Sequence, residues 1–562
     1  MAVYKILKVA PHDQNLSKLL SKKLGISELL ARVLINRGIT DAISAEKFLK
    51  VKLENLLDPN SFIDMPKAVA LVQKAAKNKD KALIFGDYDV DGITSVALLK
   101  TVLSGMGISH QHYIPHRVKE GYGLNKNIFH IIKQNNIKLF ITADCGINNK
   151  EEIQELRRLG TEVIITDHHE QLLEGKSHAS ATINPKVSGS GYKFRDLAGV
   201  GVAFKFCQAI SGKKLLQDLD LVCLGTIADV VPLTGENRII VKEGLRLIPG
   251  TRRLGLKALM EASRLKSEKI NAMSVSYIIG PRINASGRVD TAETALKLLL
   301  TEETEEAKTL AAAIEENNRF RQRIEGKILE EANAIIDSEI NFKDHKVIVI
   351  AKDGWHHGVL GIVASKLVDK FYRPVIIISL GADLCKGSGR SIKNFHLFQM
   401  LTECKEHLKE FGGHKHAAGL VIKRDKVEGF KIMLNRLAVE KLKAEDLMPT
   451  IEVDAEVSLT ELTFKTVLEL KSLEPFGAEN PEPLFYTKGL FLKSEPKALS
   501  RDTIKFWVSD GSITCEVIGF GKGGIKDSLL SAESFDLVFT PKIDDWTGED
   551  RLVLEMEEIF FK

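Results

Sequence analysis

The chain has 562 residues, of which 44% are hydrophobic and 27% are charged, and its formal net charge is only +4. This length exceeds what one hydrophobic core supports and predicts about three or four domains, while the ordinary composition excludes long disordered stretches. Because the charges nearly balance, any nucleic-acid binding must come from local clusters of Lys and Arg.

The six cysteines are scattered along the chain without a Cys-x-x-Cys pair. That pattern indicates neither a structural zinc site nor a disulfide framework, and it suits a reducing compartment. The first residues lack the apolar stretch of a signal peptide, and no apolar run approaches the length of a membrane span. We therefore expect a cytoplasmic protein without a membrane contact.

The first half of the chain reads as a small helical segment followed by an α/β domain. Residues 1–65 carry short helical patterns such as SELLARVLINRG. Over residues 66–300, β-rich runs such as KALIFG, KLFIT and TEVIIT first alternate with helical patterns, and the later part is mainly helical. The alternation predicts a parallel sheet with crossover helices.

The second half predicts three further parts. Residues 301–340 form one long charged helix, with apolar residues spaced by threes and fours. Residues 341–445 form a second α/β domain, in which the strand patterns KVIVIA and RPVIIISL flank a helix pattern. Residues 446–562 carry short strand patterns such as IEVDAEV, TIKFWVS and FDLVFTPKI, which predict a small β-barrel, and an OB-fold fits its size.

The stretch FGDYDVDG places Asp87, Asp89 and Asp91 directly after the first strand pattern. Three like charges in so short a loop repel one another and raise each other's pKa unless a cation lies among them. A calcium loop of the EF-hand type is excluded, because the twelfth position from Asp87 is Leu98, where a glutamate is required, and a strand pattern precedes the loop.

Acidic or histidine residues also follow the next strand patterns. Asp144 follows the strand pattern in KLFITADCG, and Asp167, His168 and His169 follow the one in TEVIITDHHE. Asp229 follows an apolar run in GTIADVV. Ligands of open α/β sheets gather outside the carboxyl ends of the strands, so these side chains should converge. A lone aspartate at a strand end is more often a helix cap than a metal ligand, and a lone histidine more often has a structural role. Helix capping does not explain why so many acids and histidines occur together here.

The predicted cluster indicates a particular class of metal and of reaction. Carboxylates with one or two imidazoles and no thiolate favour Mn²⁺ or Mg²⁺ over zinc. The candidate ligands suffice for two ions, and two ions roughly 3.5–4 Å apart clamp the attacking and leaving oxygens of a phosphoryl displacement. We expect hydrolysis of a phosphate ester or anhydride, and the residues alone leave DNA, pyrophosphate and cyclic dinucleotides open as substrates.

Long motifs of the chain resemble a known family. GDYDVDG, TADCG, TDHH with NPK, and GTIADVVPL resemble the ordered motifs of the DHH phosphoesterase superfamily. Within it, IPHRVKEGYGLN, GPRINASGRVD, GSGRSI, FGGHKHAAGL and LEPFGAENPEPLF are similar to segments of its single-strand-specific 5′→3′ DNA exonucleases. The resemblance covers nearly the whole chain. It implies a DHH-type parallel-sheet catalytic domain, a long connecting helix, an α/β DHH-associated domain and a C-terminal OB-fold barrel that binds nucleic acid.

The resemblance also implies roles for the acids and histidines. Two Mn²⁺ or Mg²⁺ ions are expected per active site, with Asp89 and Asp91 binding one ion each and Asp144 bridging them. His168 and Asp229 would complete the second ion's site.

Three neighbours of these ligands receive separate roles from the same resemblance. Asp87 is counted among the metal ligands, although related enzymes carry a histidine at that position. His169 is similar to the residue that polarises the scissile phosphate or the nucleophilic water. Asp167 would orient a histidine from behind the ligands.

A pocket for a 5′ phosphate and the nucleotides behind it is implied as well, and it would set the polarity of degradation. The DNA-binding residues expected from the resemblance are Arg117, Arg282, Asn284, Ser388, Arg390, His414 and His416. Guanidinium and hydroxyl groups set among glycines can approach phosphate closely. For Arg288, a pairing with nearby Asp290 is an equally good interpretation.

The barrel supplies candidates for base stacking and phosphate contacts. They are the aromatic residues Phe506, Trp507, Phe520 and Trp546 and the basic residues Lys505, Lys522 and Lys526. Any single aromatic residue among them is more often part of the core than of a platform.

The leading hypothesis is a metal-dependent exonuclease, specific for single-stranded DNA, that releases mononucleotides from the 5′ end during DNA repair and recombination. One alternative is a DHH-type phosphodiesterase or pyrophosphatase that acts on small nucleotides, and the barrel and the length of the motifs count against it. Another is a non-catalytic single-strand-binding module for recombination, and the intact set of acids counts against that. The expected partners are single-stranded DNA and, as candidates, a helicase and a single-strand-binding protein, and the resemblance suggests a monomer.

Overall fold

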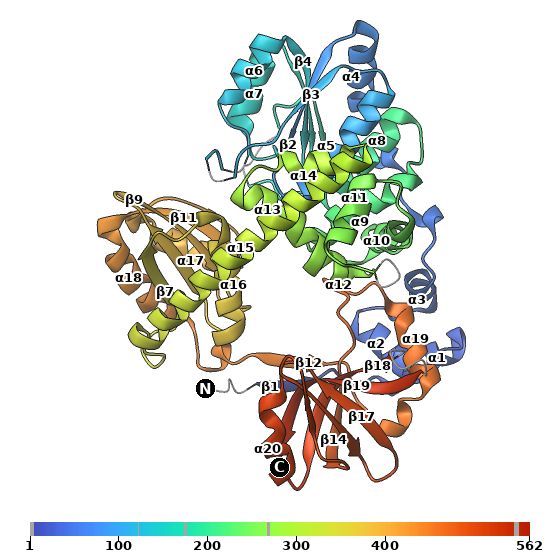
Figure 1. The fold of residues 1–562 in the computed structure, drawn as a ribbon. Helices are drawn as coiled ribbons and strands as arrows, with labels where there is room; N and C mark the ends of the chain where they lie inside the picture. The colour runs from blue at the N-terminus through green and yellow to red at the C-terminus, as the bar shows by residue number, and fades with distance from the viewer. Residues whose placement is uncertain (1–4, 118, 122, 173–176, 267–269, 545–549) are drawn as a thin grey trace. The chain divides into compact units, whose positions relative to one another are not determined.

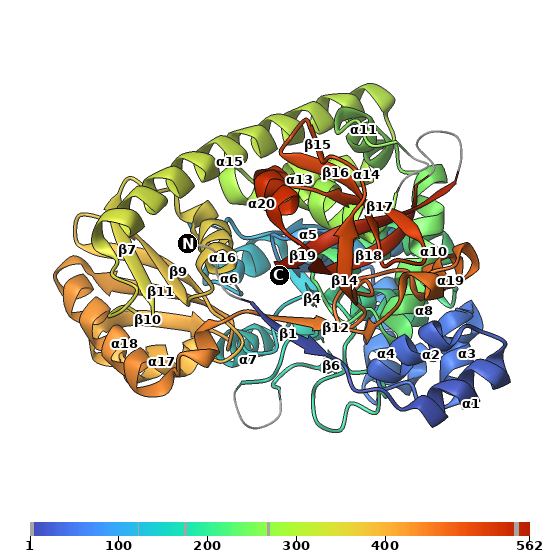
Figure 2. The ribbon, with the colours of Figure 1, turned by 90° about the horizontal axis from the view of Figure 1, so that it is seen from below.

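The computed structural model of the chain describes residues 5–117, 119–121, 123–172, 177–266, 270–544 and 550–562, and Figures 1 and 2 draw its path. Its internal contacts divide it into two compact units. The first unit holds residues 58–229 and 244–449. The second unit holds residues 6–57, 230–243 and 450–562, so it is assembled from three separate stretches of the chain.

The first unit contains a five-stranded sheet with the strand order β3-β2-β4-β5-β6, in which every pair is parallel. Its strands are β2 (Lys81–Gly86), β3 (His110–Tyr113), β4 (Ile137–Ala143), β5 (Glu162–Thr166) and β6 (Ala181–Ile183). Strands β2, β4 and β5 are buried almost end to end, as expected of parallel strands covered on both faces. The parallel α/β sheet predicted from the sequence is confirmed.

Helices cover this sheet, and one of them fixes the aspartate loop. They are α4 (Met65–Asn78), α5 (Val90–Gly105), α6 (Asn127–Asn135), α7 (Lys150–Arg158) and α8 (Gly199–Ser211). Helix α5 begins soon after β2 because the Asp89 side chain caps it, accepting from the N–H of Gly92 at 3.0 Å. Its apolar side chains are buried on all sides, so the loop is held between a buried strand and a buried helix.

The helical part that follows leads to one very long helix. It comprises α9 (Leu219–Ala228), α10 (Gly235–Leu247), α11 (Leu254–Ala262), α12 (Ala272–Ser274), α13 (Gly280–Val289) and α14 (Glu293–Leu300). Helix α15 (Thr304–Glu339) then runs for 36 residues, and Figure 2 shows it along its length. The long connecting helix expected from the sequence is confirmed.

A second α/β domain completes the first unit. Its sheet has the order β10-β11-β9-β8-β7, with only β7 and β8 parallel. The strands are β7 (Ile348–Asp353), β8 (Val375–Leu380), β9 (Leu384–Arg390), β10 (Leu408–Gly413) and β11 (Ala417–Lys423). The helices are α16 (Leu360–Phe371), α17 (Leu397–Glu403) and α18 (Val427–Lys441). Separate hydrophobic clusters cover the two faces of this sheet, as predicted for an α/β domain.

The second unit is built around a β-barrel. Its sheet has the order β13-β14-β18-β19-β17-β16-β15, and an additional β14–β16 pairing closes it as in an OB-fold. The strands are β13 (Ala455–Glu456), β14 (Phe485–Leu492), β15 (Lys497–Leu499), β16 (Thr503–Ser509), β17 (Thr514–Gly519), β18 (Phe535–Asp544) and β19 (Arg551–Phe561). Two short helices, α19 (Phe464–Leu470) and α20 (Lys526–Ser531), accompany them. The predicted OB-fold is confirmed.

The N-terminal helices belong to the core of this second unit. They are α1 (Gln14–Leu24), α2 (Glu28–Asn36) and α3 (Ala42–Leu49), and Leu30 and Leu34 of α2 share one hydrophobic cluster with the barrel. A short strand before them, β1 (Ile6–Val9), pairs in parallel with β12 (Thr450–Val453). The sequence predicted the helices but not this strand.

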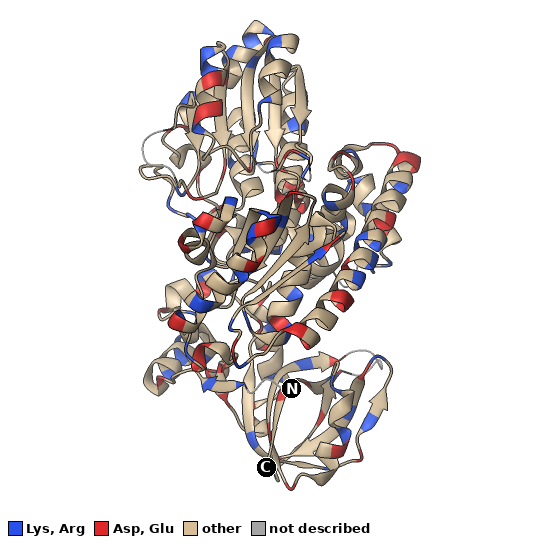
Figure 3. Cartoon of the chain, turned by 90° about the vertical axis from the view of Figure 1, so that its left-hand side faces the viewer, with Lys and Arg blue, Asp and Glu red and all other residues tan. Residues whose placement is uncertain are grey.

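Charge and apolar surface are distributed as the composition suggests. Figure 3 shows Lys and Arg interspersed with Asp and Glu over the chain, in keeping with the net charge of +4. Within the described residues, no helix has both the length and the apolar character that a bilayer crossing requires. All six cysteines are free and buried.

Candidate active site

Acidic and histidine residues lie at the carboxyl ends of three neighbouring strands. Asp87 follows β2, Asp144 follows β4, and Asp167 follows β5. The backbone N–H of each donates to a carbonyl at the end of the next strand, with the Asp144 N–H 3.0 Å from Thr166 O. Asp144 has a left-handed backbone with φ 63°, a conformation that Asp and Asn adopt more readily than most residues. The strand ends therefore hold these carboxylates at one edge of the sheet.

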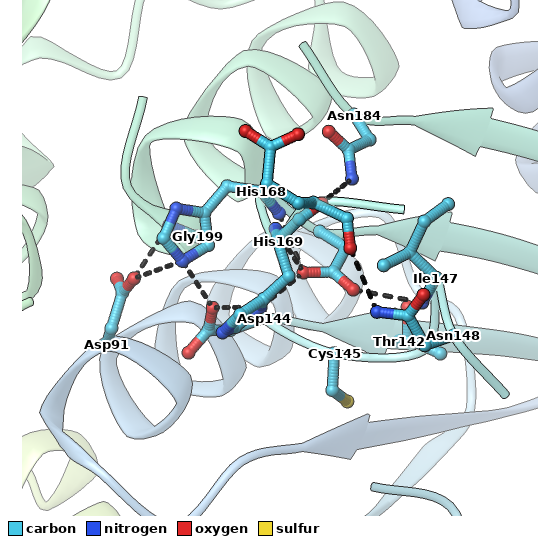
Figure 4. A network of polar contacts seen from close by, with 12 residues as sticks. Asp91, Thr142, Asp144, Cys145, Ile147, Asn148, His168, His169, Asn184 and Gly199 are labelled. Atoms are coloured by element: carbon cyan, nitrogen blue, oxygen red, sulfur yellow. Dashed lines mark hydrogen bonds and ion pairs between the residues drawn. The ribbon is translucent and has the colours of Figure 1, made fainter. Parts of the chain in front are cut away.

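Asp91 and Asp144 meet at the start of helix α8. Asp91 lies in the first turn of α5, and its carboxylate accepts from the N–H groups of Gly199 at 2.6 Å and Val200 at 2.8 Å. The N-terminus of a helix is the end that favours negative charge. Gly199 must lack a side chain, because a Cβ there would lie 2.3 Å from Asp144 Oδ1. Figure 4 shows this approach. Gly199 was not predicted from the sequence, where its only signal is the pair of glycines in AGVGVAF.

The imidazole of His168 lies among three carboxylates, two of which, those of Asp91 and Asp144, are labelled in Figure 4. Its Nε2 is 3.3 Å from Asp144 Oδ1, 3.4 Å from Asp229 Oδ2 and 3.9 Å from Asp91 Oδ2. Within the described part of the chain, this Nε2 and Asp144 Oδ1 are buried without a hydrogen-bond partner, and so is Asp87 Oδ1. Buried polar atoms rarely lack a partner, and bound cations would provide partners for these three.

The possible ligand atoms fall into three overlapping sets, in each of which the atoms lie within 4.8 Å of one another. The sets are Asp87 with Asp89 and Asp144, Asp91 with His168 and Asp229, and Asp144 with His168 and His169. Because Asp144 and His168 each belong to two sets, the sets are adjacent. Oxygen donors with few imidazoles are the chemistry of Mn²⁺ and Mg²⁺ sites, so these residues fit the cofactor predicted from the sequence.

Burial and mutual repulsion set the protonation of this cluster. Burial and then the charge of Asp89 raise the pKa of Asp91 to about 7. Burial and neighbouring aspartates also raise the pKa well above the usual range for the carboxyls of Asp87, Asp144 and Asp229. Burial lowers the pKa of His168 to about 3, so its imidazole is neutral, which is the form that binds metals. Such crowded carboxylates lose their protons readily only when a cation compensates them.

His169 differs from His168 in exposure and in charge. Its side chain is 31% exposed, against 7% for His168, so His169 is the more accessible of the two histidines. Burial alone would lower the pKa of His169, but the hydrogen bond and charge of Asp167 raise it to about 9. The same Asp167 accepts from the N–H groups of His168, His169 and Ile147, which fixes the whole turn after β5.

Arginines gather beside the aspartate loop. The guanidinium of Arg117 lies 4.8 Å from the centre of the ring of Tyr88, a residue of that loop. Burial, followed by the charges of Arg117, Arg321 and Arg390, lowers the pKa of Arg288 to about 9. Arg288 donates to the carbonyl of Gly358 at 3.1 Å. A group of like charges of this kind is a favourable place for an anion.

The other predicted DNA-binding residues have varied surroundings. Ser388 and Arg390 lie on β9, and Ser388 helps to line an open hollow of about 460 Å³ together with His357, Lys386, Gly412 and Gly419. His414 and His416 are exposed in the turn between β10 and β11. By contrast, the side chain of Arg282 pairs with Glu315 at 2.7 Å, and that of Asn284 accepts from the N–H of Val90 at 3.1 Å.

Three parts of the chain match known protein families. Residues 81–226 match the DHH family, N-terminal domain, residues 344–440 match the DHHA1 domain, and residues 453–558 match the RecJ OB domain. The matches fall on the parallel-sheet domain, the second α/β domain and the barrel described above.

The chain is also similar over nearly its whole length to curated exonucleases. The single-stranded-DNA-specific exonuclease RecJ of Bacillus subtilis is 38% identical over 549 residues, which cover 97% of this chain and 70% of that protein. The chain belongs to the RecJ family. The RecJ of Haemophilus influenzae is 32% identical, with 92% of this chain and 94% of that protein covered.

Solved RecJ structures share this fold. The structure of RecJ in complex with Mn²⁺ from Thermus thermophilus has a TM-score of 0.85 at 28% identity, covering 99% of this chain and 80% of that one. The complex with Mg²⁺ from the same organism has a TM-score of 0.80 at 26% identity, covering 99% and 78%. The two ions in those structures are the two that the donor set of this chain favours, and the predicted cofactor, Mn²⁺ or Mg²⁺, is confirmed.

The aromatic residues predicted to stack on bases differ in their exposure on the RecJ OB domain of this chain. Phe506 is 1% exposed and belongs to the core, whereas Trp507, the next residue on β16, is 39% exposed. Phe520 is 60% exposed. Trp546 lies outside the described residues. Alternation along β16 therefore places Trp507 and Lys505 on the outer face of the barrel.

The candidate lysines of the barrel all lie near acids. Lys505 pairs with Glu516 at 2.8 Å and Lys526 with Glu495 at 3.2 Å, while Lys522 is 4.0 Å from Glu558. Each of these lysines is partly exposed.

Proposed function

We propose that this chain is a metal-dependent exonuclease that degrades single-stranded DNA from the 5′ end and releases mononucleotides. Membership of the RecJ family supports the substrate and the reaction class. The observation that carries the proposal is the cluster of buried, unpartnered carboxylate and imidazole atoms at the ends of β2, β4 and β5. Such a cluster is suited to hydrolysis of a phosphodiester with the help of two ions.

The three sets of ligand atoms support an assignment of two ions. Asp87, Asp89 and Asp144 would hold one ion, and Asp91, His168 and Asp229 would hold the other, with Asp144 between them. When bound, the ions would neutralise the negative charge that develops on the scissile phosphate.

The remaining residues of the turn after β5 would act on the phosphate itself. His169, with its pKa raised to about 9, is protonated at neutral pH and can donate a hydrogen bond to a phosphate oxygen. Asp167 holds the His169 ring at 2.8 Å and keeps it in that charged form.

Polarity would follow from the arginine group. Arg117, Ser388 and Arg390 are proposed to bind the 5′ phosphate, with Arg288 behind them. Arg282 and Asn284 are also proposed to serve this pocket, although Arg282 would have to exchange Glu315 for DNA. His414 and His416 are proposed to contact the strand from the β10–β11 turn.

The wider setting is proposed from the sequence and the fold together. The segments 1–65, 66–300, 301–340, 341–445 and 446–562 are proposed as the order of parts along the chain, while residues 6–57 and 230–243 join the barrel in the second unit. The six free cysteines support a place in the reducing cytoplasm. A monomer that acts in DNA repair and recombination, together with a helicase and a single-strand-binding protein, is the proposed working form.

The deciding experiment is a time course on single-stranded DNA labelled at the 5′ or the 3′ end, with Mn²⁺ or with a chelator. Labelled mononucleotide should appear at the earliest times only from the 5′-labelled strand, and it should disappear with chelator and on blunt duplex. Earliest release from the 3′ label would overturn the polarity. Hydrolysis of pyrophosphate or a linear dinucleotide beside intact DNA would show that the substrate class is wrong.

A further inference from the structure

A series of close contacts leads from the aspartate loop to the proposed phosphate pocket, and all of them lie within the first unit. The series begins at Gly287 in α13, where a Cβ would lie 2.7 Å from the backbone oxygen of Tyr88, a residue of the aspartate loop. The side chain of Asn284, three residues earlier, accepts from the N–H of Val90 at 3.1 Å. Helix α13 therefore packs directly on the loop that carries the first proposed metal ligands.

The residue after Gly287 contacts the second α/β domain. A Cβ on Gly358 would lie 2.3 Å from Arg288 O, and the Arg288 guanidinium donates to Gly358 O at 3.1 Å. The backbone and the side chain of Arg288 thus both meet the same glycine. Because Arg288 O is a backbone atom inside a helix, it cannot move aside alone as the end of a side chain can. The contact fixes α13 against the segment that contains Gly358.

That segment, residues 355–359, is held firmly in the second α/β domain and leads directly into α16. Trp355 is 4% exposed in a hydrophobic cluster of the domain, its Nε1 donates to Glu331 at 2.8 Å, and its carbonyl accepts from Ser379 at 2.7 Å. The N–H of Gly358 donates to His356 Nδ1 at 3.1 Å. A displacement at Gly358 is therefore passed on to the domain.

The same segment continues into the wall of the phosphate pocket. Gly361 lies in the first turn of α16, and a Cβ there would lie 2.7 Å from Arg390 Nη2 and 3.1 Å from Ser388 Oγ. These neighbours end flexible side chains, so a methyl group would displace the guanidinium and the hydroxyl rather than the helix. Neither Gly358 nor Gly361 has a positive φ, so alanine at either position would alter packing without straining the backbone.

We propose that Gly358 is a positioning residue, which sets the distance between the metal centre and the phosphate pocket through its contact with Arg288. The inference rests on the proposed function, since it needs both the ions and the pocket for the 5′ phosphate. A strand held by its 5′ phosphate brings a phosphodiester onto the metals only if this distance is right. A misplacement of about 1 Å can cost roughly a hundredfold in rate, so the effect should appear in kcat.

The test compares the kinetics of full-length variants, with Mn²⁺, on single strands that carry a 5′ phosphate or a 5′ hydroxyl. In Gly358→Ala, kcat on phosphorylated strands should fall roughly 10- to 100-fold while KM stays near the parental value, because pocket and metal centre each remain intact. A strand with a 5′ hydroxyl is not held in the pocket and can slide, so its kcat should change much less. Parental kcat on phosphorylated strands, or an equal fall on both kinds, would overturn the proposal.

A structural measurement supplies a readout that does not depend on activity. Ordinary contact between carbon atoms needs about 3.5 Å, so a methyl group on Gly358 should push α13 and the 355–359 segment apart by roughly 1 Å. Crystal structures of the parent and of Gly358→Ala should show this as a longer distance between the Cα atoms of Asp144 and Arg390. An unchanged distance would contradict the spacing role.

Two further glycines provide matched substitutions. Gly361→Ala acts on the pocket itself, so it should raise KM for phosphorylated strands roughly 3- to 10-fold with little change in kcat. Gly326→Ala, in α15 where a Cβ would meet no atom within 4 Å, should leave both constants at the parental values. The same pattern of kcat and KM in Gly358→Ala and Gly361→Ala would mean that both glycines act on the pocket alone, and the spacing role would be refuted.

Arg288→Met serves as a second variant in case Gly358→Ala does not fold, as judged by its thermal midpoint. It leaves both backbones in place and removes the donor to Gly358 O. The ratio of kcat on phosphorylated strands to kcat on hydroxyl strands should fall, and KM should change less than kcat. An unchanged ratio would refute the spacing role.

The parent protein separates failure of this inference from failure of the proposed function. If the parent degrades both kinds of strand with equal constants, there is no phosphate pocket to position, and the inference falls with it. If the parent prefers phosphorylated strands and Gly358→Ala keeps that preference in full, the pocket stands and the spacing role alone is refuted.

Discussion

Asp144 combines an unusual backbone with a crowded carboxylate, and this makes a clean substitution possible. Asn also tolerates the left-handed conformation at φ 63°, so Asp144→Asn removes the charge without straining the turn. We expect kcat to fall at least about a thousandfold, because metal-ion catalysis supplies several kcal/mol of transition-state stabilisation. Binding of a labelled single strand, followed by fluorescence anisotropy in chelator, should stay near the parental value.

The same substitution should stabilise the protein when metal is removed. Burial and then the neighbouring aspartates raise the pKa of Asp144, so its charge is unfavourable without a cation. The thermal midpoint of Asp144→Asn in chelator should lie above that of the parent. Asp425→Asn, at an exposed position of the same unit, is the control and should change neither activity nor midpoint. Parental activity in Asp144→Asn would exclude the proposed bridging ligand.

The pKa of Asp91 predicts how pH acts on the metal centre. Burial and the charge of Asp89 raise the pKa of Asp91 in the folded, metal-free protein to about 7, above the unfolded value of about 3.9. The folded state then holds the extra proton between about pH 4 and about pH 7, so the stability of metal-free protein should fall as pH rises through this range.

Mn²⁺ must displace that proton, so its affinity should rise with pH through this range. Thermal midpoints recorded from about pH 5.5 to about pH 8.5 with chelator and with Mn²⁺ would show both trends. In Asp91→Asn the slope in chelator should flatten. A metal-free protein that becomes more stable as pH rises towards about 7 would contradict the assignment.

Arg390 tests the proposed pocket for the 5′ phosphate. Its side chain is partly buried, and burial followed by the like charge of Arg117 lowers its pKa, so a bound phosphate would relieve an unfavourable arrangement. Arg390→Ala should raise KM for 5′-phosphorylated strands about 10- to 100-fold and have much less effect on 5′-hydroxyl strands.

Arg424→Ala is the matched control for this pocket, because Arg424 lies in the same domain in an exposed pair with Asp353. It should leave the kinetics on both kinds of strand unchanged. If Arg390→Ala raises KM equally for 5′-phosphorylated and 5′-hydroxyl strands, Arg390 does not recognise the 5′ phosphate.

Sequence reasoning worked best for residues whose role is local. The acids and histidines of DYDVDG, TADCG and TDHH lie where strands end, and the chain direction alone brings them to one edge of the sheet. Gly199 and Gly358 were missed, because their roles depend on packing against segments distant along the chain. The pairing of Arg282 with Glu315 was likewise not predictable, because it depends on the packing of α13 against α15.

At the level of elements, the alternation along β16 gives the barrel one candidate binding face. Trp507 lies on the outer face of β16, paired across the sheet with Glu516 of β17, and Lys505 is two residues earlier on the same strand. Stacking of a base on an aromatic side chain is worth about 1–3 kcal/mol, so Trp507→Ala should weaken single-strand binding roughly 5- to 150-fold. Fluorescence anisotropy with a labelled oligonucleotide, in chelator to prevent hydrolysis, would measure it.

Phe464→Ala provides the comparison, since Phe464 is 40% exposed on α19 of the same unit but lies outside the barrel strands. Its affinity for the strand should match that of the parent. If Trp507→Ala also binds like the parent, the outer face of β16 is not the platform.

Elements with strong local patterns were predictable, and elements defined by a distant partner were not. The 36-residue helix α15 is indicated by its spacing, and the buried parallel strands by their apolar runs. Strand β1 has only four residues, and its partner β12 lies near the other end of the chain. No local pattern encodes such a partner, so the patterns of the N-terminal segment predicted its helices and missed the strand.

The whole molecule shows the same limit on a larger scale. Reading along the chain suggests consecutive parts, but the second unit joins residues 6–57, 230–243 and 450–562 around one core. The helices α2 and α3 share their hydrophobic cluster with the barrel, and Arg238 of the middle stretch donates to the carbonyls of Phe48 and Leu473, so it connects all three stretches. Contacts between such distant segments depend on surfaces that form only after each stretch has folded locally.

Two units with separate cores should unfold in two steps, and the metal should act on only one of them. All proposed ligands belong to the first unit, so Mn²⁺ at about 100 times its Kd would stabilise that unit by about 2.7 kcal/mol. In differential scanning calorimetry, Mn²⁺ should move one of two transitions upward by a few degrees. Leu529→Ala, which empties part of the second core at a cost of about 2–5 kcal/mol, should move only the other. A single transition that both treatments shift as a whole would mean that the units unfold together and that neither core is independent.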